Sequence, residues 1–361
     1  MITITDTCKQ HPCPLPWQHQ IPPESVIFDI ETTGFSPKSA FIYLVGALTL
    51  KNGSWQITQW LAESPEDEPE ILSDFLGFLS GFRHLIHFNG EAFDLPFLKK
   101  RCKKHKLPCG HLDGGQSIDL YRMYRPLKKF LGLSSMNLKA LENFLEYSRG
   151  DELDGQKLIA VYHEFSRAKS PALRRLLLLH NHDDLLGTAA LFPLSAYLEL
   201  LEGAFSLNAS PSVQINQESL ALTFSIGLHT PVPRPISIAR EHGNFTASGS
   251  DAALHVHGIY GTLKHFFDDY RSYYYLPLED TAIHKSVAAY VDKEHRIPAK
   301  ASNCYCKKRG HFLPGFAGFQ MPKFYQSYGD PQFYHECTEA FLEDSGKLYT
   351  YITDFLHTLQ H

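Results

Sequence analysis

The sequence predicts an α/β fold in which a mixed sheet is flanked by helices and followed by a smaller β-rich α+β domain. Three observations predict it. Short apolar stretches typical of strands come first, helical patterns dominate from about residue 137 to residue 200, and the composition changes after Leu207. We therefore expect an irregular lead-in over 1–24, an α/β domain over 25–207, and a β-rich domain with terminal helices and an unassigned role over 208–361.

The first predicted domain opens with strand signals. An apolar stretch over 25–30 ends beside acidic residues, and the stretches 41–50 and 54–61 flank an Asn-Gly pair that is typical of a hairpin turn. The polar, Pro-rich stretch before residue 25 predicts irregular structure. Further strand candidates are 84–88 and 117–120, and helices are expected over about 65–80, 93–106 and most of 137–200.

The second predicted domain has shorter elements. Gly and Pro residues separate five strand candidates, which indicates a small antiparallel unit with helices near its end. The strand candidates are 220–228, 236–240, 244–248, 252–257 and 261–267, and the helix candidates are 281–290 and 339–359.

Composition excludes some classes of protein. Hydrophobic residues make up 43% of the 361 residues, which excludes a mostly disordered chain. Lys and Arg number 34 against 39 Asp and Glu, and the formal net charge of −5 argues against a polybasic nucleic-acid binder. Local patches and metal ions can still supply positive charge.

The same sequence predicts where the protein works. We expect no membrane partner, because no run of 18 apolar residues occurs and no basic leader precedes an apolar stretch at the start. Seven cysteines, an odd number, fit reduced thiols, so we expect a cytoplasmic protein.

Acidic side chains lie at three points of the predicted α/β domain. Asp29 and Glu31 are two residues apart at the end of a strand, so both face the same side. Asp94 lies near the start of a helix, and His180 and Asp184 share one face of another helix. Two carboxylates at one point are unfavourable unless a cation neutralises them, so the pattern predicts a metal site.

Each of these residues also has an ordinary structural explanation. Asp29 could end a strand in a turn, Asp94 could cap its helix, Asp184 could be solvated and His180 could be a core histidine. For all of these explanations to hold, the three acidic motifs would each have to arise for an unrelated structural reason. The Asp29–Glu31 pair would also remain without a neutralising charge. The joint pattern therefore favours a catalytic metal site.

The three acidic motifs resemble those of a known family. Asp29-Ile30-Glu31, Asn89-Gly90-x-x-Phe93-Asp94 and His180-Asn181-x-x-Asp184 resemble the three motifs of the DEDD exonucleases, which belong to the ribonuclease H-like superfamily. The residue patterns of the second and third motifs are most similar to those of the YprB-type branch. The resemblance covers roughly residues 26–197 and implies a ribonuclease H-like fold for that part only.

The resemblance implies a two-metal-ion 3′→5′ exonuclease. Asp29, Glu31, Asp94 and Asp184 would hold two Mg²⁺ or Mn²⁺ ions about 3.5–4 Å apart. His180 matches the position that orients or deprotonates the attacking water in the superfamily. Asp183 is a rival to Asp184 for the fourth ligand. The two lie about 100° apart around the helix, so both cannot face the site equally.

The alternative functions are a catalytically silent nucleic-acid-binding protein on the same fold and a protein-interaction module. The presence of all four acidic positions argues against lost turnover. Protein partners are not indicated by any motif.

Several residues near the motifs could contact a single-stranded DNA or RNA end. Thr32 and Thr33 can donate hydrogen bonds to phosphate, Gly34 permits a tight turn, and Asn89 is either a substrate contact or only a turn former. Lys103 and Lys104 belong to a basic run over 99–106 that either grips phosphates or is a solvated helix end. A second basic and aromatic group has the same two explanations and comprises Tyr121, Arg122, Tyr124, Arg125, Lys128 and Lys129.

The last third of the chain has two features without a firm assignment. Cys304 and Cys306 could belong to a zinc site, although Cys-x-Cys is not the usual spacing. An aromatic group beside Arg271 either packs in a core or stacks on bases, and it comprises Phe266, Phe267, Tyr270, Tyr273, Tyr274 and Tyr275. We expect this domain to guide substrate to the first.

Overall fold

The computed structural model describes residues 1–9, 11–150, 155–215, 219–316, 318 and 321–360. The chain divides into two compact units, Met1–Leu198 and Glu199–His361. The composition change after Leu207 lies close to this division.

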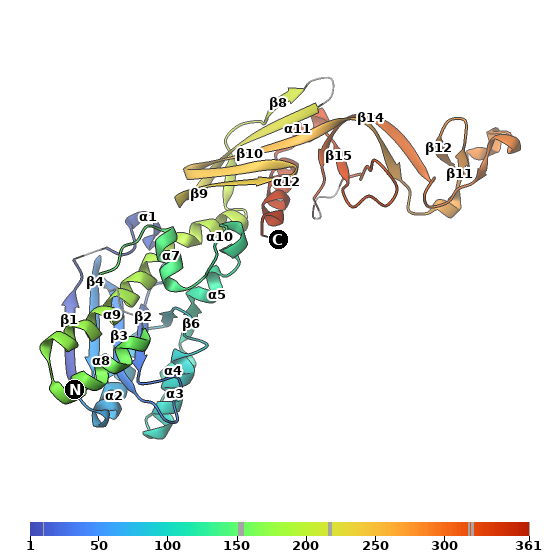
Figure 1. Ribbon diagram of the computed structural model, residues 1–361. Helices are drawn as coiled ribbons and strands as arrows, with labels where there is room; N and C mark the ends of the chain where they lie inside the picture. The colour runs from blue at the N-terminus through green and yellow to red at the C-terminus, as the bar shows by residue number, and fades with distance from the viewer. Residues whose placement is uncertain (10, 151–154, 216–218, 317, 319–320, 361) are drawn as a thin grey trace. The chain divides into compact units, whose positions relative to one another are not determined.

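The first unit is built on a mixed six-stranded sheet with the order β1-β4-β3-β2-β5-β6 (Figure 1). The first four strands in this order are antiparallel, and β5 and β6 join β2 in parallel. The predicted mixed sheet is therefore confirmed. The strands are β1 Ile2–Thr7, β2 Ser25–Thr32, β3 Ile42–Lys51, β4 Ser54–Leu61, β5 His84–His87 and β6 Gln116–Asp119.

The prediction of an irregular lead-in is wrong for the first residues. Strand β1 pairs with β4 from Ile2 opposite Leu61 to Thr7 opposite Gln56. Alternating Ile and Thr is a strand signal, but it is short and the Pro-rich stretch behind it obscures it. The partner strand, 50 residues further along the chain, makes this edge strand stable.

Helices cover the sheet of the first unit. Helix α9 packs on β2, β3 and β4, and α2 packs on β3 and β4. Between them, the apolar residues of β2 and β3 form a buried core with Phe75 and Leu98. The α-helices of this part are α1 Leu15–Gln18, α2 Glu68–Leu79, α3 Asp94–Lys104, α4 Gly110–Gly114, α5 Leu120–Tyr124, α6 Leu127–Phe130, α7 Leu138–Phe144, α8 Gly155–Ala168, α9 Pro171–Ala190 and α10 Ser195–Leu201, with 3-10 turns at Pro65–Asp67 and Phe192–Leu194.

One stretch of the described chain, Pro171–Leu201, is long and apolar enough to cross a membrane by length and composition. However, 83% of its most apolar window is buried within the protein, as is typical of a core helix.

The second unit is dominated by two long paired strands rather than the predicted short ones. Strands β9 and β10 pair over most of their length, with bulges around Gly249 that keep the ladder continuous past residues expected to end a strand. The main sheet has the order β15-β14-β10-β9-β7, with β8 on β9, and a small sheet has the order β12-β11-β13. The strands are β7 Phe205–Leu207, β8 Ser212–Ile215, β9 Ser219–Arg240, β10 Gly243–Phe266, β11 Tyr273–Leu276, β12 Thr281–His284, β13 Ile297–Pro298, β14 Tyr305–Pro314 and β15 Tyr334–Glu336.

Of the two helices predicted for the second unit, the structure contains one. The helix expected over 281–290 is wrong, because Thr281–His284 pairs with β11 and only 3-10 turns at Ala288–Tyr290 and Lys293–His295 follow. The terminal helix is confirmed, as α11 Glu339–Leu342 and α12 Ser345–Thr358. Phe267 and Tyr273 stack on each other and, with Tyr270 and Tyr275, pack around buried Cys304.

Candidate active site

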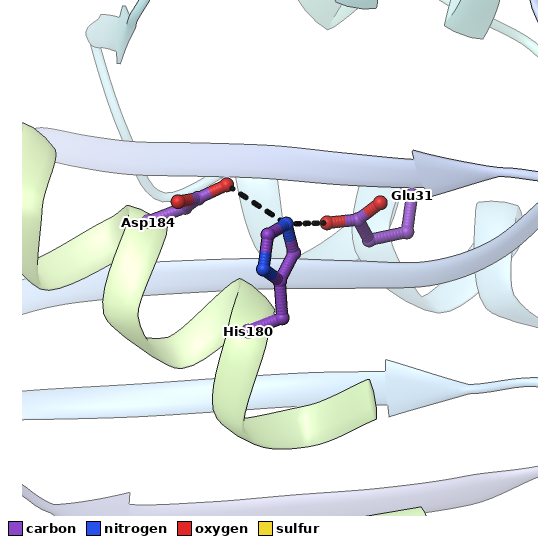
Figure 2. Close-up of side chains that lie close together, drawn as sticks. All are labelled: Glu31, His180 and Asp184. Carbon is purple, nitrogen blue, oxygen red and sulfur yellow. Dashed lines mark ion pairs between the residues drawn. The ribbon is translucent and has the colours of Figure 1, made fainter. Parts of the chain in front are cut away.

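Three of the predicted site residues come together where α9 crosses β2. His180 Nε2 on α9 lies 3.4 Å from Glu31 Oε1 on β2 and 3.5 Å from Asp184 Oδ2, one turn further along α9 (Figure 2). One ligand atom from each residue lies within 4.8 Å of the others, a spacing suited to a shared metal ion. No other such group of His, Cys, Asp or Glu occurs among the described residues, so neither Cys304 nor Cys306 belongs to one.

The other two predicted metal ligands, Asp29 and Asp94, are not part of this group, but they are close enough to its carboxylates to be influenced by their charge. Burial raises the pKa of Asp29 well above its usual value, and repulsion from Asp184, Glu31 and Asp94 raises it further. Asp94 begins α3 and accepts a hydrogen bond from the backbone N–H of Ile30 at 3.3 Å. Burial, partly offset by backbone hydrogen bonds, raises its pKa to about 7.

This crowding of carboxylates fits a divalent cation. Desolvated carboxylates that repel one another hold protons unless a positive charge takes their place. Carboxylate oxygens suit hard divalent ions, whereas structural zinc sites favour cysteine and histidine. The donor set on β2, α3 and α9 therefore suits a hard divalent cation.

The close approach of α9 to the sheet depends on Gly46 and Asn181. Asn181 Nδ2 donates to Asp29 Oδ2 at 2.9 Å, and its Oδ1 accepts from Gln59 Nε2 at 2.8 Å. Gly46 lies between Asp29 and Gln59 in the sheet, and a Cβ there would come within 2.0 Å of Asn181 Oδ1. Glycine on β3 thus lets one buried amide fix Asp29 and the register of α9 together.

Asp183 and Asp184 point in different directions. Asp183 Oδ2 accepts the backbone N–H of Gly150 at 2.8 Å, and Asp183 Oδ1 lies 3.0 Å from His182 Nδ1. Asp184 faces His180 instead. The structure therefore groups Asp184, and not its neighbour, with Glu31 and His180.

Arg149 and Glu142 are site residues that sequence reasoning missed. Arg149 Nη1 lies 2.5 Å from Asp184 Oδ1, and its Nε and Nη2 donate to both oxygens of Glu142. Glu142 is buried, with 2% of its side chain exposed, and Arg149 is 8% exposed. No motif contains Arg149, so only the fold reveals that a buried ion pair supports Asp184.

A third missed residue is Tyr43 on β3. Burial raises the pKa of its hydroxyl well above the usual value, and nearby Glu31 and Asp29 raise it further. A buried phenol beside two carboxylates stays protonated and is therefore a hydrogen-bond donor at neutral pH.

The turn before α3 is organised by Asp119 at the end of β6. Asn89 has a left-handed backbone with φ of 59°, and its N–H donates to Asp119 Oδ1 at 2.9 Å. Asp119 also accepts the N–H of Glu91 at 3.2 Å and caps α5. Beside this turn lies a pocket of about 790 Å³, lined by Phe88, Asn89, Tyr121, Arg125, Lys128, Ser134, Ser135, Met136 and Asn137.

The predicted phosphate contacts lie in different settings. The Thr32 hydroxyl donates to the Gly34 carbonyl at 2.9 Å, and the Thr33 hydroxyl accepts the N–H of Phe41 at 3.1 Å, so both are used within the turn. Lys103 and Lys104 lie at the opposite end of α3 from Asp94, about 14 Å along the helix. The roles of these residues and of Asn89 in substrate binding stay predictions.

Part of each basic group is structural. Arg101 is 3% exposed and binds buried Glu68 through two guanidinium nitrogens, so it does not extend the basic run 99–106 at the surface. Tyr124 is fully buried and shares a hydrogen bond of 2.9 Å with Ser195. Tyr121, Arg125 and Lys128, in contrast, line the pocket beside Asn89.

Comparison with known proteins identifies the first unit. The family model of the RNase H superfamily matches residues 26–195. Over 175 residues, 46% of this chain, the sequence is 27% identical to the uncharacterized protein YprB of Bacillus subtilis. Residues 26–195 form a ribonuclease H-like domain of the YprB type.

Only part of YprB aligns with this chain. The matched region spans 40% of YprB, so about two fifths of that protein corresponds to this chain. Among solved structures, a family B DNA polymerase from Pyrobaculum calidifontis aligns with a TM-score of 0.41 and 20% identity, covering 50% of this chain and 26% of the polymerase. Domains of the RNase H superfamily, which the family model matches here, typically use divalent metal ions.

Proposed function

We propose that this protein is a metal-dependent nuclease that removes nucleotides from the 3′ end of single-stranded DNA or RNA, by a two-metal-ion mechanism. The observation that supports it best is the grouping of Glu31, His180 and Asp184, with Asp29 bound by Asn181 of the same helix and Asp94 bound to the backbone N–H of Ile30. Convergent carboxylates beside a histidine suit phosphodiester hydrolysis, because that reaction needs charge neutralisation and a base in one place.

The residues divide into two roles. Asp29, Glu31, Asp94 and Asp184 would hold Mg²⁺ or Mn²⁺, which when bound supplies an activated water and stabilises the leaving oxygen. His180 presents Nε2 to the same point and can accept the proton of the attacking water there. Asn181 positions Asp29, and Arg149 positions Asp184.

The pocket beside Asn89 suits a nucleotide chain. It combines an aromatic ring, Tyr121, with two cations, Arg125 and Lys128, next to the turn that leads into Asp94. Stacking on the ring and attraction to the cations are the two interactions that single-stranded nucleic acids offer without regard to sequence. We therefore place the nucleotides next to the scissile bond in this pocket.

A product ladder tests the proposal. The full chain is incubated with Mn²⁺ or Mg²⁺ and single-stranded DNA or RNA labelled at the 5′ or the 3′ end. A 3′→5′ exonuclease shortens the 5′-labelled strand one nucleotide at a time and releases the 3′ label as a mononucleotide. A fixed internal product would instead indicate endonucleolytic attack, and intact strands would indicate a silent binding protein.

Two variants show that cleavage comes from this site. Asp29→Asn and Asp94→Ala should abolish cleavage while the fold is retained, because removing one member of a like-charge cluster relieves repulsion. Circular dichroism and thermal unfolding measure the fold. Substantial cleavage by either folded variant would contradict the assignment.

A further inference from the structure

One face of the main sheet in the second unit carries both basic and aromatic side chains, and it lies outside the ribonuclease H-like domain. Strands β10 and β14 pair with Tyr260 opposite His311 and Phe266 opposite Tyr305. Residues directly opposite in an antiparallel pair share a face, and every second residue joins them. This basic-aromatic face comprises Tyr260, Thr262, Lys264 and Phe266 of β10 and Tyr305, Lys307, Arg309 and His311 of β14.

The rings of this face gather around Phe266. Its ring centroid lies 5.3 Å from Tyr305 and 5.3 Å from Tyr328, and 6.0 Å from Tyr325. Tyr325 extends the face because its backbone pairs with that of Lys264. Tyr328 is 57% exposed, and a pocket of about 640 Å³ beside it is lined by Phe266, Tyr325 and Tyr328 among other residues.

The cations of the face lie beside these rings. Lys264 Nζ is 4.5 Å from the centroid of the Tyr305 ring, and the Arg309 guanidinium is 5.4 Å from that of Tyr260. Lys307 lies opposite Lys264 in the strand pair, is exposed and donates to Asp280 at 2.9 Å. Three cations are thus spaced along a row of aromatic rings.

Core packing accounts for only one ring of the face, Tyr305, which is 6% exposed. The core of this region lies on the other side of the same strands, where Leu263, Phe312 and Phe324 are buried together. Lys307 and Arg309 are exposed, and Phe266 and Tyr325 are only partly buried. Strand β14, Tyr305–Pro314, runs beside its partner β10 in the second unit (Figure 1).

We propose that the basic-aromatic face binds single-stranded nucleic acid, with the bases on the rings and the phosphates on Lys264, Lys307 and Arg309. Aromatic rings interleaved with cations attract both parts of a nucleotide, whereas an acidic peptide would use only the cations. Six residues of extended strand give about 20 Å, the length of about six stacked nucleotides at 3.4 Å each. This binding needs no metal ion and goes beyond the proposed cleavage.

Neighbouring lysines on β14 supply a matched test. Lys307 and Lys308 follow each other in one strand, both exposed and each ion-paired with one carboxylate, Asp280 at 2.9 Å and Glu336 at 2.6 Å. Their side chains lie on opposite faces, because Lys307 pairs with Lys264 and Lys308 with Leu263. Lys307→Ala therefore removes one charge from the proposed face, and Lys308→Ala removes one charge from the other.

Binding is measured on the full chain in EDTA, by fluorescence anisotropy with labelled oligo-dT and oligo-rU, at several salt concentrations. Lys307→Ala should weaken binding and lower the slope of log affinity against log salt by about 0.7, the value for one phosphate contact on a single strand. Lys308→Ala should leave both quantities unchanged. Because EDTA removes divalent ions, this result is independent of whether the protein cleaves.

Stacking is tested separately with Tyr328→Leu. We expect a loss of affinity of about fivefold or more with an unchanged salt slope, since a base loses its ring but no phosphate loses its cation. Tyr290→Leu is the control, because Tyr290 is 93% exposed in the same unit and lies outside the face.

Three results would overturn the proposal. Equal effects of Lys307→Ala and Lys308→Ala would leave only general electrostatic attraction. Absence of oligonucleotide binding by the folded chain at low salt would remove the ligand class. Poly-glutamate that competes as well as the oligonucleotides would assign the face to an acidic protein segment instead.

Discussion

At Asp184, the two carboxylate oxygens face different partners. Oδ2 lies 3.5 Å from His180 Nε2, and Oδ1 lies 2.5 Å from Arg149 Nη1. Arg149 in turn holds Glu142, whose pKa burial raises, while the Arg149 guanidinium itself stays charged because its carboxylate partners raise its pKa in spite of burial. The orientation of the Asp184 carboxylate therefore depends on a buried ion pair contributed by α7 and the loop that follows it.

Removing Arg149 should destabilise the protein. Arg149→Met leaves Glu142 buried without its cation, and we expect the free energy of unfolding to fall by about 3–5 kcal/mol at pH 8. The loss should be smaller at pH 5, because unpaired Glu142 can take up a proton. Urea unfolding measures this, with exposed Arg175→Met on α9 as the control. A loss no larger than that of the control would contradict the role of the pair.

His180 should act on turnover more than on metal binding. His180→Gln removes the base but leaves the four carboxylates, so we expect cleavage to slow by about 10²–10⁴-fold. Calorimetric titration with Mn²⁺ should show a much smaller change in metal affinity. If affinity and turnover fell together by the same factor, His180 would be a metal ligand rather than the base.

At the scale of elements, one buried carboxylate joins α2, α3 and β3. Glu68, at the start of α2, accepts from Arg101 Nε of α3 at 2.7 Å, from the Ile42 N–H of β3 at 2.9 Å, and pairs with His105 at 2.7 Å. Burial alone would raise the pKa of Glu68, but these hydrogen bonds lower it below its usual value. The network fixes the helix that begins at Asp94.

Glu68→Gln should therefore have a pH-dependent effect. A lowered pKa in the folded state means that Glu68 contributes stability above its unfolded pKa, about 4.3, and loses it as pH falls through the folded pKa. At pH 7 the variant leaves Arg101 buried without its anion, and we expect a loss of about 3–5 kcal/mol.

The measurement compares the two proteins by denaturant unfolding between pH 7 and pH 3. The difference in stability between wild type and Glu68→Gln should shrink below about pH 4.3. A difference that stays constant over this range would show that the carboxylate charge does not carry the stabilisation.

At the scale of the whole molecule, the phosphates of the proposed substrate would approach a chain of net charge −5. Divalent ions can offset this charge at the site, and clusters of cations can do so elsewhere. Lys103 and Lys104 lie about 14 Å along α3 from Asp94, so they would touch nucleotides several positions from the scissile bond.

The double substitution Lys103→Ala/Lys104→Ala tests this path. If both lysines contact phosphates, the slope of log affinity against log salt for a single strand should fall by about 1.4, or 0.7 for each contact. Cleavage of a bound strand should keep its rate, because neither residue touches the reacting atoms. An unchanged slope would make this cluster only a favourable helix end.

Features that depend on local periodicity were predictable from the residues alone. A spacing of two predicted that Asp29 and Glu31 lie on the same side of β2, a spacing of four predicted that His180 faces Asp184, and the Asn-Gly pair predicted the hairpin of β3 and β4. The matching family motifs predicted the ribonuclease H-like fold of residues 26–195.

Features that depend on residues far apart in the chain follow from how the elements pack. Strand β1 forms because β4 offers it an edge, β9 and β10 continue through Gly and Pro because each supplies the other with hydrogen bonds, and Asp184 rather than Asp183 faces the site because α9 docks over Gly46. Arg149 reaches Asp184 from outside every motif. Local patterns fix which side of an element a residue occupies, whereas its partners depend on how distant elements pack.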